Sequence, residues 1–228
     1  MKVVLLHAFP LDERMWEPQL EPLRDYEVVT PRLYGRGRTI DDYAASVLAD
    51  VEGELVLAGA SLGGYTALAM AHREPPRVRA MALVGARADA DSPERRAGRA
   101  DTKELIESGG AEALWENQRP RLLLEDAGED TVSRVREQVV DRSTSELVEA
   151  LAAIRDRDDR SDTLSGFAGP VLVGVGEGDL FFPPDEAQQQ VAMAQRGRFR
   201  AFAGARHLPS VEQPDEFNAV LTGFLADV

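Results

Sequence analysis

A serine between two glycines is the first feature of this sequence that could do chemistry. In the stretch LAGASLGGYTALA, residues 57–69, Ser61 has Gly59 and Gly63 two positions away on either side. An apolar run precedes the serine and a helical pattern follows it. This context predicts a sharp strand-to-helix turn, with a strained serine and no room for flanking side chains. The turn would raise the hydroxyl above the sheet, near helix amides that favour negative charge. Ser61 is therefore the candidate nucleophile.

A serine hydroxyl needs a general base, and the sequence holds three histidines. His72 lies near the end of the helical stretch that follows the serine, where we expect a surface role at a helix C-terminus. His7 ends the first apolar run, in LLHAFP, and is expected to fix the shape of that loop. His207 lies in the loop FAGARHLPSVEQP before the last helical stretch and is the predicted base.

The base in turn needs a carboxylate that orients its ring. Asp179 follows the fifth apolar run, in the glycine-rich stretch VGVGEGDLFFPP. The chain order serine, aspartate, histidine is the one expected when the serine lies in a strand-to-helix turn of this kind. Glu177 is the local alternative. Asp89 and Asp91, in GARADADSP after the fourth apolar run, are the distant alternatives. Asp179 is the predicted acid, and the other three carboxylates remain alternatives for this role.

Acyl transfer also needs hydrogen-bond donors for the oxyanion of the tetrahedral intermediate. One expected donor is the backbone N–H of Leu62, directly after the nucleophile. The other should come from the loop after the first apolar run, HAFP, as the backbone N–H of Phe9. These groups predict attack on an ester carbonyl, an acyl-enzyme, and hydrolysis of that intermediate by water.

Short apolar runs alternate with amphipathic stretches, and these elements must position the reactive residues. The expected strands are Val3–Leu6, Val28–Thr30, Leu55–Ala58, Ala80–Val84, Val171–Val175 and Phe199–Phe202. The expected helices are Asp12–Leu23, Ile40–Val51, Leu62–His72, Asp185–Ala194 and Pro214–Ala226. Continuously apolar strands are buried on both faces. The alternation predicts an α/β fold, with a mostly parallel sheet of about six strands and helices on both faces.

The alternation breaks once, between residues 86 and 167, where charged helical segments replace strands. We expect residues 1–85 and 168–228 to form the core, and residues 86–167 to form a helical cap over the carboxyl ends of the strands, where α/β folds bind ligands. Apolar side chains of this cap could line an acyl pocket, or could serve packing alone. The candidates are Trp115, Leu122, Leu123 and Leu124.

Composition narrows the classes of function. The 228 residues include 26 Lys and Arg against 40 Asp and Glu, a net charge of −14, which would repel nucleic acid and anionic membranes. There is no cysteine, so disulfides and thiolate chemistry are excluded. No segment is apolar over the length of a membrane span or a signal peptide. We expect a cytoplasmic monomer or homodimer acting on a small molecule, and the predicted chemistry needs neither a metal nor an organic cofactor.

With these motifs in this order, the chain resembles the α/β-hydrolase superfamily over nearly its whole length. The stretches LLHAFPLDERMW, SLGGYTALAMA, LVGARADADSPERRAGR and ALAAIRDRDD are similar to bacterial 3-oxoadipate enol-lactonases and to related carboxylesterases. The resemblance implies a serine hydrolase with a Ser-Asp-His triad. Lactone hydrolysis, C–C bond hydrolysis or acyl transfer on the same triad, and a ligand sensor that retains the triad, are the alternatives.

Three features depart from the family pattern. Relatives usually carry a strand pair before the first strand found here; if that pair is missing, Val28–Thr30 becomes a sheet edge and a route to a dimer. Ala8 stands where the oxyanion loop usually has glycine. Arg32 stands where relatives often have aspartate.

Charge also bears on the substrate. A chain with net charge −14 repels a carboxylate-bearing lactone unless a local arginine compensates. The candidates for that arginine are Arg32, Arg87, Arg119 and Arg121, and surface solvation is the simpler role for each. The sequence therefore favours a neutral ester of small to medium size over an anionic lactone.

Overall fold

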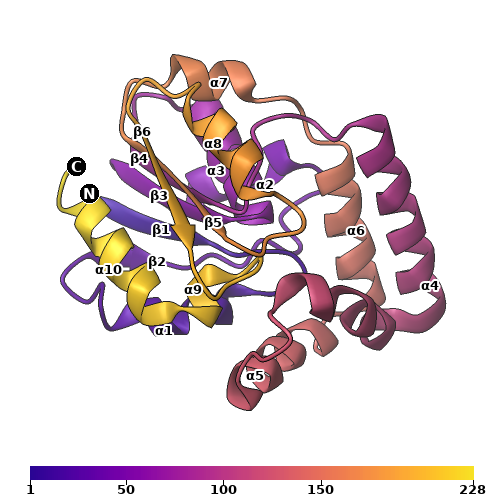
Figure 1. Ribbon diagram of the computed structural model, residues 1–228. Coiled ribbons are helices and arrows are strands. Elements are labelled where there is room, and N and C mark those ends of the chain that lie inside the picture. The colour runs from indigo at the N-terminus through magenta and orange to yellow at the C-terminus, as the bar shows by residue number, and fades with distance from the viewer.

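One parallel sheet forms the centre of the protein, and the computed structural model describes all 228 residues (Figure 1). Its strands are β1 (Lys2–Leu6), β2 (Glu27–Val29), β3 (Leu55–Ala60), β4 (Val78–Val84), β5 (Val171–Gly176) and β6 (Gly197–Phe202). They lie in the order β2-β1-β3-β4-β5-β6, and every neighbouring pair is parallel. All six carboxyl ends therefore meet at one edge, and the loops that follow them are the places where a site can form.

Helices cover both faces of the sheet. They are the 3₁₀-helix η1 (Glu13–Trp16) and the α-helices α1 (Glu17–Leu20), α2 (Ile40–Asp50), α3 (Leu62–Arg73), α4 (Pro93–Leu122), α5 (Glu129–Val140), α6 (Thr144–Arg155), α7 (Ser161–Gly166), α8 (Pro184–Val191), α9 (Pro209–Glu212) and α10 (Pro214–Leu225). The predicted α/β fold class is confirmed. No helix is both long enough and apolar enough to cross a bilayer.

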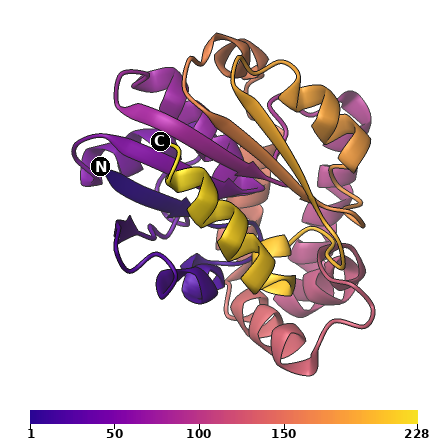
Figure 2. The same ribbon diagram turned by 60° about the vertical axis from the view of Figure 1, so that its left-hand side comes forward.

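Alternate side chains of each strand divide the core into two apolar clusters. Val4 and Leu6 face the cluster under α2, α3 and α8. Val3 and Leu5 face the other cluster, with aromatic side chains of η1 and α10. Figure 2 shows α10 lying across this second face. From Val3 to Leu6 both faces of β1 are buried, which is why this part of its sequence is continuously apolar rather than alternating.

The expected elements agree closely with the observed ones, apart from the first helix. A single helix was expected over residues 12–23, but a 3₁₀ turn runs to Trp16 and a separate short helix starts at Glu17. Pro18 occupies the first turn of that second helix, where its missing N–H costs no hydrogen bond. Within a longer helix the same proline would leave a carbonyl unpaired, so the chain restarts here.

Four helices, α4 to α7, lie between β4 and β5; we call residues 93–166 the helical insertion. Its longest member, α4, is broken at Gly110, where φ is +68° and ψ is −159°. Only glycine adopts such angles without strain. The break divides α4 into two helical arms, and the first runs beside α6 (Figure 1). The insertion contributes buried side chains to both apolar clusters, Leu114 to one and Trp115 to the other.

Candidate active site

Ser61 sits in the turn between β3 and α3 with φ +47° and ψ −109°, the one non-glycine residue with positive φ. Close backbone contacts explain why the residues two positions before and after Ser61 are glycines. A methyl group on Gly59 would overlap the carbonyl of Gly63, and one on Gly63 would overlap the carbonyl of Leu6 in β1. The turn is closed by hydrogen bonds from the amides of Gly64 and Tyr65 to the Ser61 carbonyl, at 2.9 and 3.1 Å. Strain of this kind persists only where the surroundings enforce it.

His207 and Asp179 form a buried pair. The imidazole Nδ1 lies 2.8 Å from Asp179 Oδ2, and the exposed fractions of the two side chains are 4% and 0%. The other carboxylate oxygen, Oδ1, accepts the amides of Phe181 at 2.8 Å and Phe182 at 3.0 Å. Since an ionised carboxylate only accepts hydrogen bonds, Nδ1 is the donor. Nε2 is left with the lone pair that a general base needs.

Ser61 and His207 both line a cavity of about 480 Å³, and Phe9 and Leu122 line it too. Asp179 lies behind His207 and does not line the cavity. Of the four apolar residues expected in an acyl pocket, Leu122 is at this wall and three are not. Trp115 and Leu123 are buried in the second apolar cluster, and Leu124 donates its amide to Glu212 Oε1 at 2.7 Å.

The backbone amides of Leu62 and Phe9 are the expected oxyanion donors. Leu62 is the first residue of α3, so its N–H has no partner within that helix. Phe9 lines the cavity, and its N–H makes no hydrogen bond within the chain. The preceding amide, on Ala8, donates instead to the Met15 sulfur at 3.1 Å.

The alternative carboxylates have other partners. Asp91 is buried among arginines, with Oδ1 2.7 Å from Arg157 and Oδ2 3.2 Å from Arg99, and coulombic attraction to these two guanidinium groups outweighs burial and lowers the pKa of Asp91. Asp89 pairs with Arg95. Glu177 is exposed and makes no side-chain contact with His207. Asp179 is the carboxylate that hydrogen-bonds the imidazole.

His7 is fully buried and connects two loops. Its Nε2 accepts the Leu33 amide at 2.9 Å, and its Nδ1 lies 3.0 Å from the Ala8 carbonyl. Nδ1 therefore carries the proton of a neutral ring. Burial lowers the pKa of His7 to about 4, and the hydrogen bond to the Ala8 carbonyl opposes that shift in part. His7 fixes the loop that presents Phe9, as its position in the sequence predicts.

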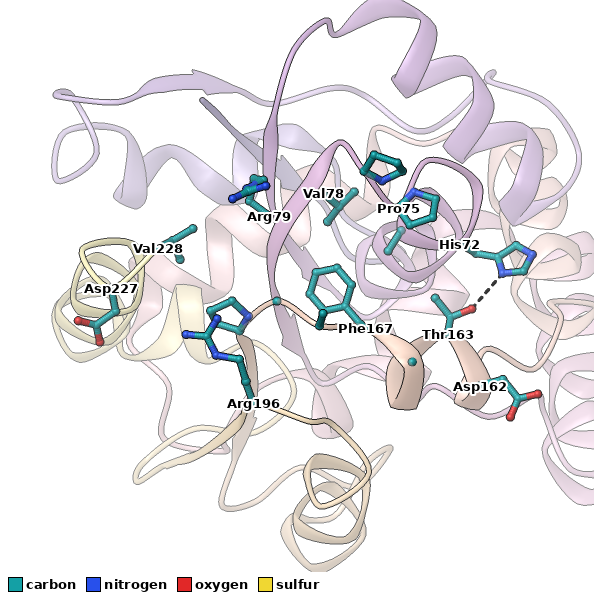
Figure 3. A pocket seen from close by; sticks show the side chains of 16 residues that line it. His72, Pro75, Val78, Arg79, Asp162, Thr163, Phe167, Arg196, Asp227 and Val228 are labelled. Atoms are coloured by element: carbon teal, nitrogen blue, oxygen red, sulfur yellow. Dashed lines mark hydrogen bonds between the residues drawn. The ribbon is translucent and has the colours of Figure 1, made fainter.

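His72 belongs to a different part of the molecule. It lies 3.1 Å from Thr163 Oγ1 at the rim of a larger cavity of about 640 Å³ (Figure 3). This second cavity opens at the amino ends of β4 and β5, where Val78 and Phe167 supply apolar wall. None of the predicted catalytic residues lines it. Size alone is therefore a poor guide to the reactive site in this protein.

Two residues near the site, Gly85 and Glu212, were not predicted from the sequence. Gly85 follows β4 with φ +56°; a methyl group there would lie 2.9 Å from Cε1 of His207 and 3.2 Å from Oδ2 of Asp179. A glycine directly after a predicted strand was the available signal. Glu212 accepts the amides of Leu124 and Arg206, at 2.7 and 2.8 Å, and so ties the loop of the base to the helical insertion. Its partners lie far apart in the sequence, and no local pattern marks them.

No group of three His, Asp or Glu side chains is placed to share a metal ion. The polar side chains that line the cavity include the Ser61 hydroxyl, the His207 imidazole, four arginines and the carboxylates of Asp91, Glu94 and Glu186. The arrangement can bind an ester, activate an alcohol and stabilise an oxyanion.

Comparison with known proteins agrees with the fold and shows the family. A family model described as "Alpha/beta hydrolase family" matches residues 3–220. An esterase from Thermogutta terrifontis, solved with malate bound, is 29% identical with a TM-score of 0.93, covering 100% of this chain and 90% of that one. The enol-lactonase from Burkholderia xenovorans LB400 is 25% identical with a TM-score of 0.87, covering 98% and 90%. A pimeloyl-[acyl-carrier protein] methyl ester esterase from Neisseria meningitidis is 25% identical, covering 98% and 92%.

Proposed function

The chain belongs to the alpha/beta-hydrolase family, and on that premise we propose that it is a serine hydrolase of small to medium carboxylic esters, lactones included, acting through an acyl-enzyme on Ser61. The observation that carries the proposal is the line from carboxylate to base to cavity. Asp179 holds Nδ1 of His207 at 2.8 Å, and His207 and Ser61 line the same cavity.

The reaction begins when Ser61 Oγ attacks the ester carbonyl and His207 Nε2 takes the hydroxyl proton. The N–H groups of Leu62 and Phe9 stabilise the oxyanion that forms on the former carbonyl oxygen. His207 then gives its proton to the leaving alcohol, and the acyl group remains on the serine. In the second half, water attacks the acyl carbon as His207 takes one of its protons. The tetrahedral intermediate then collapses, His207 returns the proton to Ser61 Oγ, and the acid departs. Asp179 stabilises the imidazolium in both halves.

The functions of the relatives support this reaction class. The two solved relatives are an esterase and an enol-lactonase, and the curated relative is a methyl ester esterase. Each of those reactions opens an ester bond to water. Hydrolysis of an enol-lactone by the same triad is the second candidate, and the enol-lactonase relative is the observation that favours it.

A fluorophosphonate probe tests the nucleophile directly. We expect one labelled peptide, containing Ser61, and loss of both labelling and ethyl ester hydrolysis in Ser61→Ala. Ser165→Ala, which changes an exposed serine whose hydroxyl bonds the Asp162 carbonyl, is the matched control and should keep both. Labelling that persists in Ser61→Ala would assign the nucleophile elsewhere.

A further inference from the structure

Cationic side chains gather around the candidate active site. Four arginines line its cavity: Arg87, Arg95, Arg99 and Arg121. They come from two places, the loop after β4 and the two arms of α4. Because α4 breaks at Gly110, residues near its start and near its end reach the same cavity. Asp91, Glu94 and Glu186 line the same cavity, so four arginines against three carboxylates leave a local excess of one positive charge in a protein of net charge −14.

Three of these arginines have carboxylate partners within the protein. Arg87 pairs with Glu186 at 2.5 Å. Arg95 pairs with Asp89, and Arg99 lies 3.2 Å from Asp91. Their charges are matched in the folded chain, so they have structural reasons to be where they are.

Arg121 differs from the other three. It makes no ion pair and no hydrogen bond within the chain, although it lies in the cavity wall. Its guanidinium carbon lies 3.9 Å from the centre of the Phe181 ring. The same ring packs on the imidazole of His207, with centroids 4.6 Å apart. Arg121 is therefore an exposed residue of the cavity wall that an aromatic face holds close to the candidate base, with its side-chain N–H donors free to bind a ligand.

The surroundings of Arg121 favour an anion. Partial desolvation, together with the positive charge of Arg99, lowers the pKa of Arg121, and the negative charge of Asp179 opposes that shift. Two guanidinium groups that repel each other are stabilised when a carboxylate binds between or beside them. Arginine is also the residue whose planar donors match the two oxygens of a carboxylate.

We propose that Arg121 binds a free carboxylate of the substrate, so that this enzyme prefers half-esters of short dicarboxylic acids over neutral esters. The proposal rests on the serine hydrolase function above and names its substrate class. It reverses the preference for a neutral ester that net charge suggests, because the whole molecule's charge acts at long range and is screened by salt, whereas the substrate meets a local cation.

The other arginines that the sequence singled out lack this geometry. Arg32 pairs with Glu146 at 2.5 Å and lies outside the cavity. Arg119, two residues before Arg121 in α4, also lies outside the cavity and donates to the Glu125 carbonyl at 3.2 Å. Arg119→Gln is therefore the matched control for Arg121→Gln.

The test compares monoethyl glutarate with ethyl valerate, in which a methyl group replaces the carboxylate, by titrating the acid released at constant pH. We expect kcat/KM of the wild type to favour monoethyl glutarate by tenfold or more, in line with about tenfold or more for one charged hydrogen bond. Arg121→Gln should lose this preference, as expected when a contact made by only one substrate is removed. Because Phe181 lies against both Arg121 and His207, any effect on the base changes kcat/KM for both esters alike and cancels in their ratio. Arg119→Gln should keep both values.

A binding measurement distinguishes carboxylate recognition by Arg121 from ester hydrolysis by Ser61. Calorimetric titration of Ser61→Ala with monoethyl glutarate should show binding that disappears in Ser61→Ala/Arg121→Gln, whether or not turnover occurs. Hydrolysis that requires Ser61 but shows no preference for the carboxylate, or a preference that survives Arg121→Gln, overturns this inference and leaves the serine hydrolase intact. Carboxylate binding that depends on Arg121, with no hydrolysis that depends on Ser61, overturns the proposed function and leaves the site of recognition.

Discussion

Gly85 shows how one missing side chain sets the geometry of a site. The His207 imidazole and the Asp179 carboxylate pack directly against its backbone, at the positive φ of +56°. A side chain at this position would both strain the backbone and push the base away from its place. The contact is invisible in the sequence, because Gly85, Asp179 and His207 come from three separate loops.

We predict that Gly85→Ala lowers kcat/KM by on the order of tenfold to a hundredfold through displacement of the base, and lowers the free energy of unfolding by about 1 kcal/mol. Steady-state kinetics and urea unfolding measure the two effects. Gly223→Ala is the control, since a methyl group on this exposed residue of α10 meets nothing within 4 Å. It should stabilise the protein by about 0.5–1 kcal/mol with unchanged activity. Equal activity in both variants would show that the base tolerates the methyl group.

The buried His7 side chain leads to a prediction about pH and stability. Its folded pKa, about 4, lies below the ordinary 6.5. Between these values the unfolded chain binds a proton that the folded chain rejects, so stability is complete above pH 6.5 and falls as the pH drops toward 4. The loss amounts to about 3 kcal/mol.

Urea unfolding of the wild type and His7→Gln at pH 7, 6 and 5 measures this term. The difference in free energy of unfolding between the two proteins should shrink as the pH falls, because glutamine does not titrate. Parallel pH curves for the two proteins would contradict the assignment. The shared loss from carboxylates such as Asp12 and Asp91, whose pKa values are lowered, cancels in the difference.

At the scale of elements, a buried ion pair fixes the helical insertion to the rest of the chain. Arg157, just after α6, bonds Asp91 Oδ1 at 2.7 Å and the Asp89 carbonyl at 2.8 Å. It also lies over the Tyr65 ring of α3, at 4.2 Å. The start of α4, the end of α6 and the helix after the nucleophile therefore meet at one guanidinium.

Removing one partner leaves a buried charge, so Arg157→Met should lower the free energy of unfolding by about 3–5 kcal/mol. Arg155→Met is the matched control, because Arg155 pairs with Asp156 at the exposed surface, where the loss should be at most about 0.5 kcal/mol. Chemical denaturation of both variants measures the difference. Similar losses for the two would show that the buried pair adds nothing.

The elements were also the part of the structure that the sequence predicted best. Short, mostly apolar runs placed all six strands, and the glycine spacing around Ser61 predicted the strained turn. The direction of the two arms of α4 was not predictable. Gly109 and Gly110 mark a break, but backbone freedom at a glycine does not specify an angle. The gathering of Arg99 and Arg121, which depends on that angle, could therefore be found only in three dimensions.

The whole molecule is organised around two apolar clusters that meet at the sheet, and the helical insertion contributes to both. Ile106 and Leu151 pack in one cluster, and Leu122 and Val139 in the other. An insertion with its own separate core would unfold on its own, whereas one that shares two cores with the sheet cannot leave either without exposing the other elements to water.

We therefore predict one cooperative thermal transition for the whole chain. Differential scanning calorimetry should give a calorimetric enthalpy equal to the van't Hoff enthalpy. Two resolved transitions, with the insertion melting first, would contradict this.

The hydrogen bonds from Leu124 and Arg206 to Glu212 have a consequence for changing what the enzyme accepts. The Glu212 carboxylate holds the segment at the end of α4, which lines the cavity, and also the loop that carries His207. Reshaping α4 for a new substrate will also shift the histidine. Directed evolution of selectivity in this scaffold should thus meet an early trade-off with turnover, and compensating changes should arise near Glu212 rather than beside the bound acid.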